Sequence, residues 1–282
     1  MEPLHAGNRR PRSLIAIRKQ TCWGGLLRAI DPLTLQRYSA SFPRRRLQEE
    51  FRFHVPKNLR GKHVLDIGCG DGHNSAFSGK ARRQSNQHCL TQSIDPAHKK
   101  AEINKVRDAT RFICSPVEEV EIPAHSFDVI WGDAILHHLI ENLEFALSRL
   151  TLWAKPGALM LFSEPVNFNN ALRRIRFALP VKTDATPDEC SLEPAELTLI
   201  RRFVPDLRVR CYSLFGRFSR FIPINYNYER SSLWRRMIVN ALASFEYAPL
   251  SLPFFQNLAG YAVFYGHLRH PGPAGNFNHD VN

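Results

Sequence analysis

Short apolar runs alternate with longer amphipathic or polar stretches along most of the chain. An apolar run of about five residues is typical of a buried strand, and a longer amphipathic stretch is typical of a surface helix. Alternation of the two at this spacing is typical of βαβ units and therefore predicts a parallel sheet. The predicted strands are 63–67, 89–94, 110–114, 127–131, 158–163, 207–214 and 261–268.

The predicted elements divide the chain into four parts. Composition changes after Pro165, where loops, aromatic residues and arginine become frequent. We expect a tail and helical cap over 1–54, an α/β core over 55–165, a lid or substrate region with late core elements over 166–258, and a last strand with a disordered tail over 259–282. The predicted helices are 26–38, 44–53, 74–83, 97–105, 140–153, 171–178 and 194–203, of which the first two are expected to pack beside or over the glycine-containing turn at 68–72.

The chain is strongly basic, with a formal net charge of +12 in 282 residues. Its arginines gather in the first fifty residues, in 173–176 and in 201–236. A field of this sign favours anionic partners: a phosphorylated or carboxylated small molecule, nucleic acid, or an acidic membrane face. A solvated basic surface without a specific partner explains the same charge, and composition does not separate the two.

The cysteines show no pairing pattern. Six of them stand at positions 22, 69, 89, 114, 190 and 211, without any C-x-x-C spacing. This predicts reduced cysteines in a cytoplasmic protein rather than a disulfide framework, and it offers no zinc or other metal site. No apolar run reaches the roughly 18 residues that a membrane-spanning helix needs, so no transmembrane segment is expected.

The stretch 64–72, VLDIGCGDG, is the most informative in the chain. Apolar residues lead into three glycines at every second position, which predicts a buried strand ending in a tight turn. Glycine tolerates positive φ and lets a ligand lie against bare backbone, and a helix after the turn would present its amides to a negative group. The spacing is G-x-G-x-G; the dinucleotide fingerprint would need a third glycine where His73 stands.

Asp95 closes the second predicted strand and is followed by Pro96. In a doubly wound sheet, ligands bind at the carboxyl ends of the strands. An acid at this position is suited to accept hydrogen bonds from the two hydroxyls of a ribose. The alternative is a surface aspartate that precedes a proline in a turn.

Four segments together resemble the successive motifs of the class I S-adenosylmethionine-dependent methyltransferases: VLDIGCGDG, IDPA, SFDVIWGDAILHHL and LWAKPGALMLFSEP. The resemblance covers residues 55–165. It implies an α/β, Rossmann-like sheet of seven strands, mostly parallel, whose last strand is antiparallel, and S-adenosyl-L-methionine as cofactor. The predicted strand 261–268 suits the antiparallel position.

The resemblance also assigns residues to the cofactor. The glycine turn would flank its methionine part, and the second strand tip would hold its ribose. Near the adenine, where the family often has an acid, either Glu118 or a backbone group of Val117 takes the place. The cofactor-binding residues implied in this way are Asp66, Gly68, Cys69, Gly70, Gly72, Asp95, Pro96, Val117, Glu118 and Asp133.

Candidate catalytic residues follow the fourth predicted strand. Asp133 begins D-A-I-L, which differs from the N/D-P-P-Y of nucleic-acid base methyltransferases and argues against base methylation. His137 and His138 are expected at the start of the next helix, where neighbours point about 100° apart, so at most one faces a pocket. An imidazole there could accept a proton from an acceptor hydroxyl, or it could contact backbone or cofactor. Glu164, at the fifth strand tip, could touch substrate or cap the following loop.

Aromatic residues interleaved with arginine over 165–258 suit a pocket for an apolar or aromatic molecule bearing an anionic group, or the core of a lid. The sequence favours a methyltransferase acting on a small molecule. An RNA or protein methyltransferase is the first alternative, although no RNA-binding motif is present, and a non-catalytic binding protein of the same fold is the second. Apolar faces in 233–255 also allow contact with a membrane surface. The oligomeric state is left open.

Overall fold

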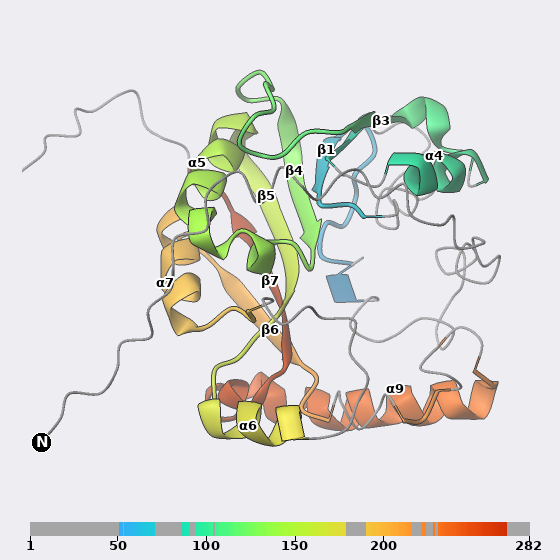
Figure 1. The fold of residues 1–282 in the computed structure, drawn as a ribbon, viewed down its shortest axis with the longest axis vertical. Coiled ribbons are helices and arrows are strands. Elements are labelled where there is room, and N and C mark those ends of the chain that lie inside the picture. Colours follow the sequence, from blue (N-terminus) through green and yellow to red (C-terminus); the bar gives the residue numbers. More distant parts are fainter. Residues whose placement is uncertain are drawn as a thin grey trace, which may run out of the picture.

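A seven-stranded sheet organises the molecule (Figure 1). The computed structural model describes residues 51–52, 54–70, 86–90, 94–103, 105–178, 190–215, 221–223, 228 and 231–269. The strand order is β3-β2-β1-β4-β5-β7-β6. Neighbouring strands from β3 to β5 are parallel, whereas β7 is antiparallel to both β5 and β6, which confirms the predicted fold class. The strands are β1 His63–Ile67, β2 Asn86–Leu90, β3 Thr110–Ile113, β4 Phe127–Asp133, β5 Ala154–Pro165, β6 Arg208–Tyr212 and β7 Tyr261–His267.

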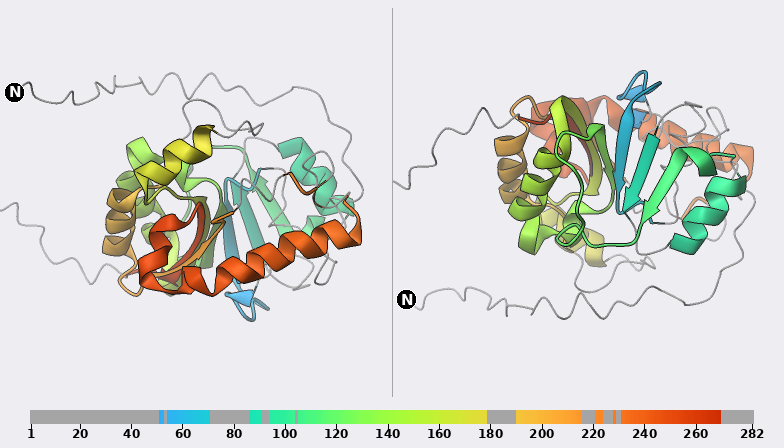
Figure 2. Two further views of the ribbon diagram at one scale, coloured as in Figure 1. Left: turned by 90° about the horizontal axis from the view of Figure 1, so that it is seen from below. Right: turned by 90° about the horizontal axis from the view of Figure 1, so that it is seen from above.

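Helices connect the strands, and α5 and α7 lie together on one face of the sheet (Figures 1 and 2). The sequence explains where α7 begins, because Pro194 needs no hydrogen-bond acceptor at a helix start and Glu193 and Glu196 form a capping box. The α-helices are α4 Ile94–Ile103, α5 Leu143–Trp153, α6 Asn170–Ala178, α7 Pro194–Phe203 and α9 Leu233–Tyr247. The 3-10 helices are η3 Arg107–Ala109, η4 Leu136–His138, η5 Ile140–Asn142, η6 Pro249–Ser251 and η7 Pro253–Leu258.

The core has two layers, one on each face of the sheet, because successive strand residues point to opposite sides. On β1, Leu65 and Ile67 join the larger layer under α5 and α7, and Val64 joins the smaller layer. Trp131, from β4, is fully buried in the smaller layer, which also packs against Phe51. Both faces of the central strands are therefore covered, as a parallel sheet requires.

The second strand ends earlier than predicted. β2 is Asn86–Leu90 rather than 89–94, and α4 begins at Ile94, so Asp95 and Pro96 lie in the first turn of a helix and not at a strand tip. The first turn suits both residues, because an acid is favoured near the positive end of the helix dipole and proline needs no acceptor there. Because β2 begins with polar residues, the apolar pattern did not predict a strand there.

The connection from β4 to α5 also differs from the prediction. The chain makes two 3-10 turns, η4 and η5, before α5 begins at Leu143, so 140–142 are not part of the helix. β5 is longer than 158–163, since Ala154 already pairs with Phe127 of β4. The other predicted strands and α7 agree with the structure to within two residues.

The region after β5 covers one end of the sheet. α6 follows β5, and the segment α9–η6–η7 precedes antiparallel β7, so these elements lie at the carboxyl ends of the parallel strands (Figures 1 and 2). The helices predicted at 26–38 and 74–83, most of that at 44–53, and the tail after 269 lie outside the described residues. The four-part division of the chain remains a prediction.

Candidate active site

The turn after β1 needs glycine for two different reasons. Gly68 and Gly70 have φ of +60° and +51°, in the left-handed region that favours glycine. A Cβ on Gly68 would lie 2.5 Å from the side chain of Ile135, in the segment after β4. Gly68 therefore lets the end of β1 pack directly against that segment.

Gly70 is exposed, and its side-chain position faces space that the described residues leave open. A Cβ built there meets no atom of the described part of the chain within 4 Å. Asp66, on β1, is buried two residues before the turn. A bare backbone beside open space at the carboxyl end of the first strand fits a ligand that lies against the turn, which is the place the resemblance assigns to the cofactor. Gly72 lies outside the described residues.

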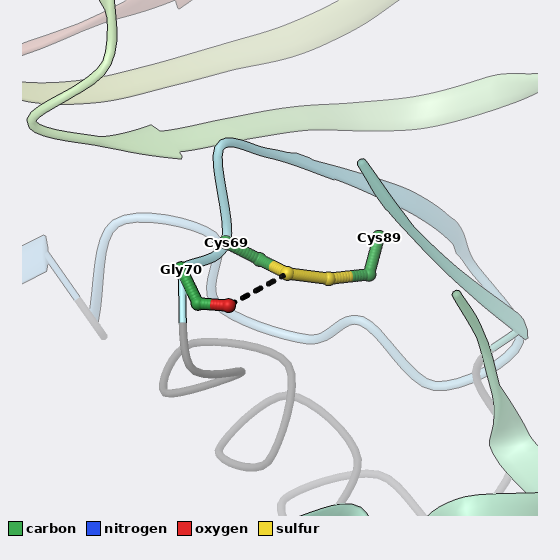
Figure 3. Close-up of a disulfide and its surroundings, with 3 residues drawn as sticks. All are labelled: Cys69, Gly70 and Cys89. Carbon is green, nitrogen blue, oxygen red and sulfur yellow. Dashed lines mark hydrogen bonds between the residues drawn. A yellow bond between two sulfur atoms is a disulfide. The ribbon is translucent and has the colours of Figure 1, made fainter. Parts of the chain in front are cut away.

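Cys69 and Cys89 form a disulfide that joins this turn to β2 (Figure 3). Their Cα atoms are 6.0 Å apart, and both side chains are buried. The expectation of reduced cysteines without a disulfide is therefore wrong. The physical reason is the parallel pairing of β1 with β2, which sets Asp66 opposite Cys89 and brings Cys69 within reach of it. Spacing along the sequence carries no sign of this contact.

Asp66 lies beside the disulfide, and its carboxylate and the two sulfurs are all within 4.8 Å of one another. A carboxylate and two cysteines are ligand types that bind metals. Cysteine binds metal as the thiolate, however, and here the two sulfurs are bonded to each other. The cluster is a cross-link, and the expectation that the site lacks a metal remains a prediction.

Asp133, at the end of β4, is held by three side chains. Arg52 forms an ion pair with it at 2.5 Å from Nη1 to Oδ2. The hydroxyls of Ser163 and Tyr261 donate to its Oδ1 at 2.8 and 2.9 Å, and Arg52 also donates to Ser163 at 3.2 Å. The network joins β4, β5 and β7 to the segment that precedes β1.

These partners decide the charge of Asp133. Burial by itself would raise its pKa, but the charge of Arg52 and the hydrogen bonds from Arg52, Ser163 and Tyr261 hold the pKa below its usual range. Burial and the neighbouring carboxylate raise the pKa of Tyr261 well above its usual value. Asp133 is thus a carboxylate with its charge already compensated, which makes it a weak base, and Tyr261 stays a neutral donor.

The chain bends at Ala134. Its φ is +54°, a conformation that disfavours residues with a Cβ by roughly 1–2 kcal/mol. Its N–H donates to the carbonyl of Ser163 at 2.8 Å, which helps to hold the strained residue in place. Strain of this kind persists where the surroundings determine it and is frequent at functional sites.

Glu164, which follows Ser163 in β5, binds the segment 135–137. Its Oε1 accepts the N–H groups of Ile135 and Leu136 at 2.9 and 2.8 Å, and its Oε2 accepts the N–H of His137 at 3.4 Å. Nδ1 of His137 lies 2.8 Å from the same Oε2. Since a carboxylate only accepts, Nδ1 donates, and the neutral imidazole then keeps Nε2 as its acceptor.

The candidate residues thus divide by location. His137 is buried and His138 exposed, with ring centroids 4.0 Å apart, and both lie in η4 rather than at the start of a long helix. Val117 packs into the core after β3, while Glu118 is half-buried in the same turn. The side chains of Asp95 and Pro96 lie outside the described part of the chain. The candidates brought together at the carboxyl edge are Gly68, Gly70, Asp133 and His137.

Arg52, Ser163 and Tyr261 are site residues that the sequence analysis missed. A serine and a tyrosine at strand ends, and an arginine in a basic segment, are ordinary in sequence. Tyr261 and Asp133 are 128 positions apart, and Arg52 and Ser163 are 111 apart. The available signal was weak: the segment 44–53, which has Arg52 near its end, was expected to pack beside or over the glycine turn.

The strand order with antiparallel β7, and the glycine turn at the carboxyl end of β1, define the architecture of a class I S-adenosylmethionine-dependent methyltransferase. Comparison with protein families agrees. Residues 37–191, more than half of the chain, match the methyltransferase domain family, and the chain belongs to that family. The methyl donor of this class is S-adenosylmethionine, as the resemblance implied.

Similar proteins differ in what they methylate. The protein arginine N-methyltransferase 6 of Danio rerio is 36% identical over 115 residues, 39% of this chain and 32% of that protein. The ubiquinone biosynthesis O-methyltransferase of Neisseria meningitidis serogroup C is 29% identical over 155 residues, 51% and 63% of the two chains. The geranyl diphosphate C-methyltransferase of Streptomyces coelicolor superposes with a TM-score of 0.51 at 13% identity, and the match covers 79% of this chain and 78% of that chain. The chain spans less than two thirds of these curated relatives, and the structural likeness concerns the fold alone.

Replacing Arg52 by Met should destabilise the protein by about 3–5 kcal/mol near neutral pH, because it leaves the carboxylate of Asp133 without its cation. The lowered pKa of Asp133 contributes stability that is present above the unfolded value of about 3.9 and is lost as pH falls through the folded value. The difference between Arg52→Met and wild type should therefore shrink as pH falls below about 4. Urea unfolding at several pH values measures it.

Lys62→Met is the matched control. Lys62 is half-exposed and lies 3.5 Å from Asp128 at the opposite edge of the sheet. Removing a cation from such a surface pair should change the free energy of unfolding by less than about 1 kcal/mol. The role assigned to the ion pair would be contradicted if the two variants lost the same free energy of unfolding. It would also be contradicted if the free-energy loss of Arg52→Met relative to wild type did not vary with pH.

Reduction of the Cys69–Cys89 disulfide should lower the thermal midpoint. The bond closes a loop with a sequence separation of 20 residues, which in the chain-entropy account stabilises the fold by roughly 3 kcal/mol. That corresponds to about 6–12 °C for a protein of this size. Calorimetry with and without a phosphine reductant should show this loss in wild type and in Cys190→Ala, which removes an exposed cysteine. The thermal midpoint of Cys69→Ala should be lower than that of wild type without reductant, and it should not change when reductant is added. A decrease equal to that of wild type would refute the cross-link.

Proposed function

We propose that the protein transfers a methyl group from S-adenosylmethionine to a small-molecule acceptor at the carboxyl edge of β1 and β4. The observation that carries this proposal is the turn after β1, where Gly70 has no Cβ and no described residue fills its side-chain position, and which packs through Gly68 against the segment bearing His137. A ligand on the turn and an acceptor near the imidazole would then share one edge of the sheet, as reaction partners must.

Residues of this edge would hold the cofactor, which supplies an electrophilic methyl group on a sulfonium. Gly68 and Gly70 offer backbone without side chains, and Asp66 supplies a buried carboxylate on the preceding strand. We also assign to it Cys69, Gly72, Pro96, Val117, Glu118 and Asp133, with Asp95 accepting hydrogen bonds from the ribose. The place of Asp95 in the first turn of α4 is close in sequence to the carboxyl end of β2.

His137 is the candidate base. Glu164 receives the Nδ1 hydrogen, which orients the ring and leaves Nε2 to accept a proton from a hydroxyl or acidic carbon. Asp133 serves better as an organiser than as a base, because its pKa is lowered and its charge is paired with Arg52. His138 is exposed and is the weaker candidate.

The charges at the edge favour a neutral or anionic acceptor. A cationic acceptor such as an arginine side chain is normally held by carboxylates, but Asp133 is paired with Arg52 and Glu164 with His137. The net charge of +12 repels cationic substrates as well. Similarity to a protein arginine methyltransferase keeps protein methylation as the second candidate. Methylation of a histone peptide but of no small molecule would decide for it.

Gly70→Ala should abolish or strongly weaken binding of S-adenosylhomocysteine, because the new methyl group enters the space that the ligand needs. Gly157→Ala is a matched control: its φ is +69°, a Cβ there also meets no described residue within 4 Å, and it stands near the start of β5, at the opposite edge. Both substitutions carry similar backbone strain. Isothermal titration calorimetry should show binding by wild type and Gly157→Ala, and a loss for Gly70→Ala. Equal affinities in all three, or no binding by wild type, would overturn the proposal.

His137→Gln should lower the rate of methyl transfer by about 10²–10⁴-fold while leaving S-adenosylhomocysteine affinity unchanged, because a general base contributes about that factor. The assay measures release of S-adenosylhomocysteine with a panel of phenols, carboxylic acids and amines. His138→Gln, which changes the exposed neighbour, should retain the wild-type rate. A rate of methyl transfer in His137→Gln equal to that of wild type would leave His137 with a structural role only.

A further inference from the structure

The solvent-facing side of α9 is apolar. Trp234, Met237, Ile238, Ala241 and Phe245 follow the spacing i, i+3, i+4, i+7 and i+11, so they form one stripe along the helix. All of them are exposed, with Trp234 at 58%, Met237 at 55% and Phe245 at 71% of their full surface. A row of large apolar side chains in water is unfavourable, and contiguous patches of this kind mark interaction sites.

The inward side of α9 carries polar anchors. Glu246 is buried and accepts the backbone N–H groups of Ser213 and Phe215 at 2.7 and 3.0 Å. Asn240, also buried, donates to the hydroxyl of Tyr228 at 2.8 Å. The usual distribution for a surface helix is thus reversed. Because these bonds fix the rotation of α9 about its own axis, the apolar stripe is held facing outward.

Further exposed apolar side chains lie outside α9, at the same end of the molecule. Leu252 and Phe254, in the η6–η7 segment that follows, are 55% and 81% exposed. α6 lies at the same end of the molecule, which Figure 2 shows from below, and it contributes the exposed Ile175. We call these residues of α6, α9 and η6–η7 the end face.

Charge on the end face is mainly basic. From 232 to 258 the only acid in the sequence is Glu246, which is turned inward, and α6 contains no acid. Arg173 and Arg174 are exposed on α6, where Arg173 also forms a half-exposed ion pair with Glu193 at 3.5 Å. Arg235 lies over the ring of Trp234 with 5.1 Å from its guanidinium carbon to the ring centroid. Apolar side chains bordered by arginine are complementary to a bilayer with anionic head groups.

We propose that the end face docks on the surface of an anionic lipid bilayer, with α9 lying in the plane of the interface. Trp234, Met237 and Phe245 enter the boundary between head groups and acyl chains, and the arginines of α6 meet the lipid phosphates. A second copy of the chain is a poorer occupant, since two end faces would bring arginines of like charge together. Nor does α9 cross the bilayer: among the described residues, no helix is long and apolar enough to do so.

Co-sedimentation with vesicles tests this directly. Wild type should bind vesicles containing about one third phosphatidylglycerol in phosphatidylcholine, should bind pure phosphatidylcholine far more weakly, and should lose affinity as salt rises. The triple variant Trp234→Ser/Met237→Ser/Phe245→Ser should bind on the order of a hundredfold more weakly, because the apolar area that inserts is gone. Arg173→Gln/Arg174→Gln should lose about fivefold per residue and show a smaller salt dependence.

The double variant Phe145→Ser/Leu152→Ser is the control. It removes two exposed apolar side chains of α5, on the face of the sheet and away from the end face, and should bind vesicles as wild type does. Far-ultraviolet circular dichroism checks that the variants fold, and S-adenosylhomocysteine affinity reports separately on the proposed function. Equal binding of both vesicle types, or wild-type binding by the triple variant, would overturn the proposal. So would a wild-type dimer that the triple variant converts to a monomer, since the end face would then join two copies.

Discussion

The candidate site depends on the hydrogen bonds that the carboxylate of Glu164 accepts. This carboxylate is completely buried at the end of β5 and accepts three backbone N–H groups and the imidazole of His137. Burying a carboxyl group without hydrogen bonds is costly, so the segment after β4 must keep the one path that points its amides at Glu164. The left-handed Ala134 and the contact of Ile135 with Gly68 follow from that path.

A second polar network lies beside the first and reaches a different part of the chain. Asp133 and Ser163 precede Ala134 and Glu164 by one residue each, and their partners Arg52 and Tyr261 come from the segment before β1 and from β7. The carboxyl edge of the sheet is therefore held by ionic and hydrogen bonds, which set side-chain directions, while the core below is apolar. α9 shows the opposite arrangement, with polar groups inside and an apolar surface. The end face and the site are therefore suited to different kinds of partner.

Predicted and observed elements agree where the local sequence carries the signal. The strand His63–Ile67 and the helix Pro194–Phe203 have the predicted bounds, because one is a clear apolar run ending at glycine and the other has a proline start and a capping box. The prediction for β2 is wrong, because Asn86, Gln87 and His88 are polar residues in a strand whose place is set by pairing with β1 and β3. His137 was predicted at the start of a long helix, whereas Glu164 holds it in a separate 3-10 turn.

The sequence by itself determined the alternation of strands and helices, the family and the place of the glycine turn, since these follow from periodicity and from motifs only a few residues long. The antiparallel last strand was what the resemblance to that family implied. Tertiary structure alone decided that Cys69 bonds to Cys89, that Arg52 neutralises Asp133, and that α9 turns its apolar side outward. Each of those depends on which distant residues the strand order brings together. The spacing of residues along a chain does not encode which strands become neighbours, and that is why a pairing across a hundred positions becomes visible only in the fold.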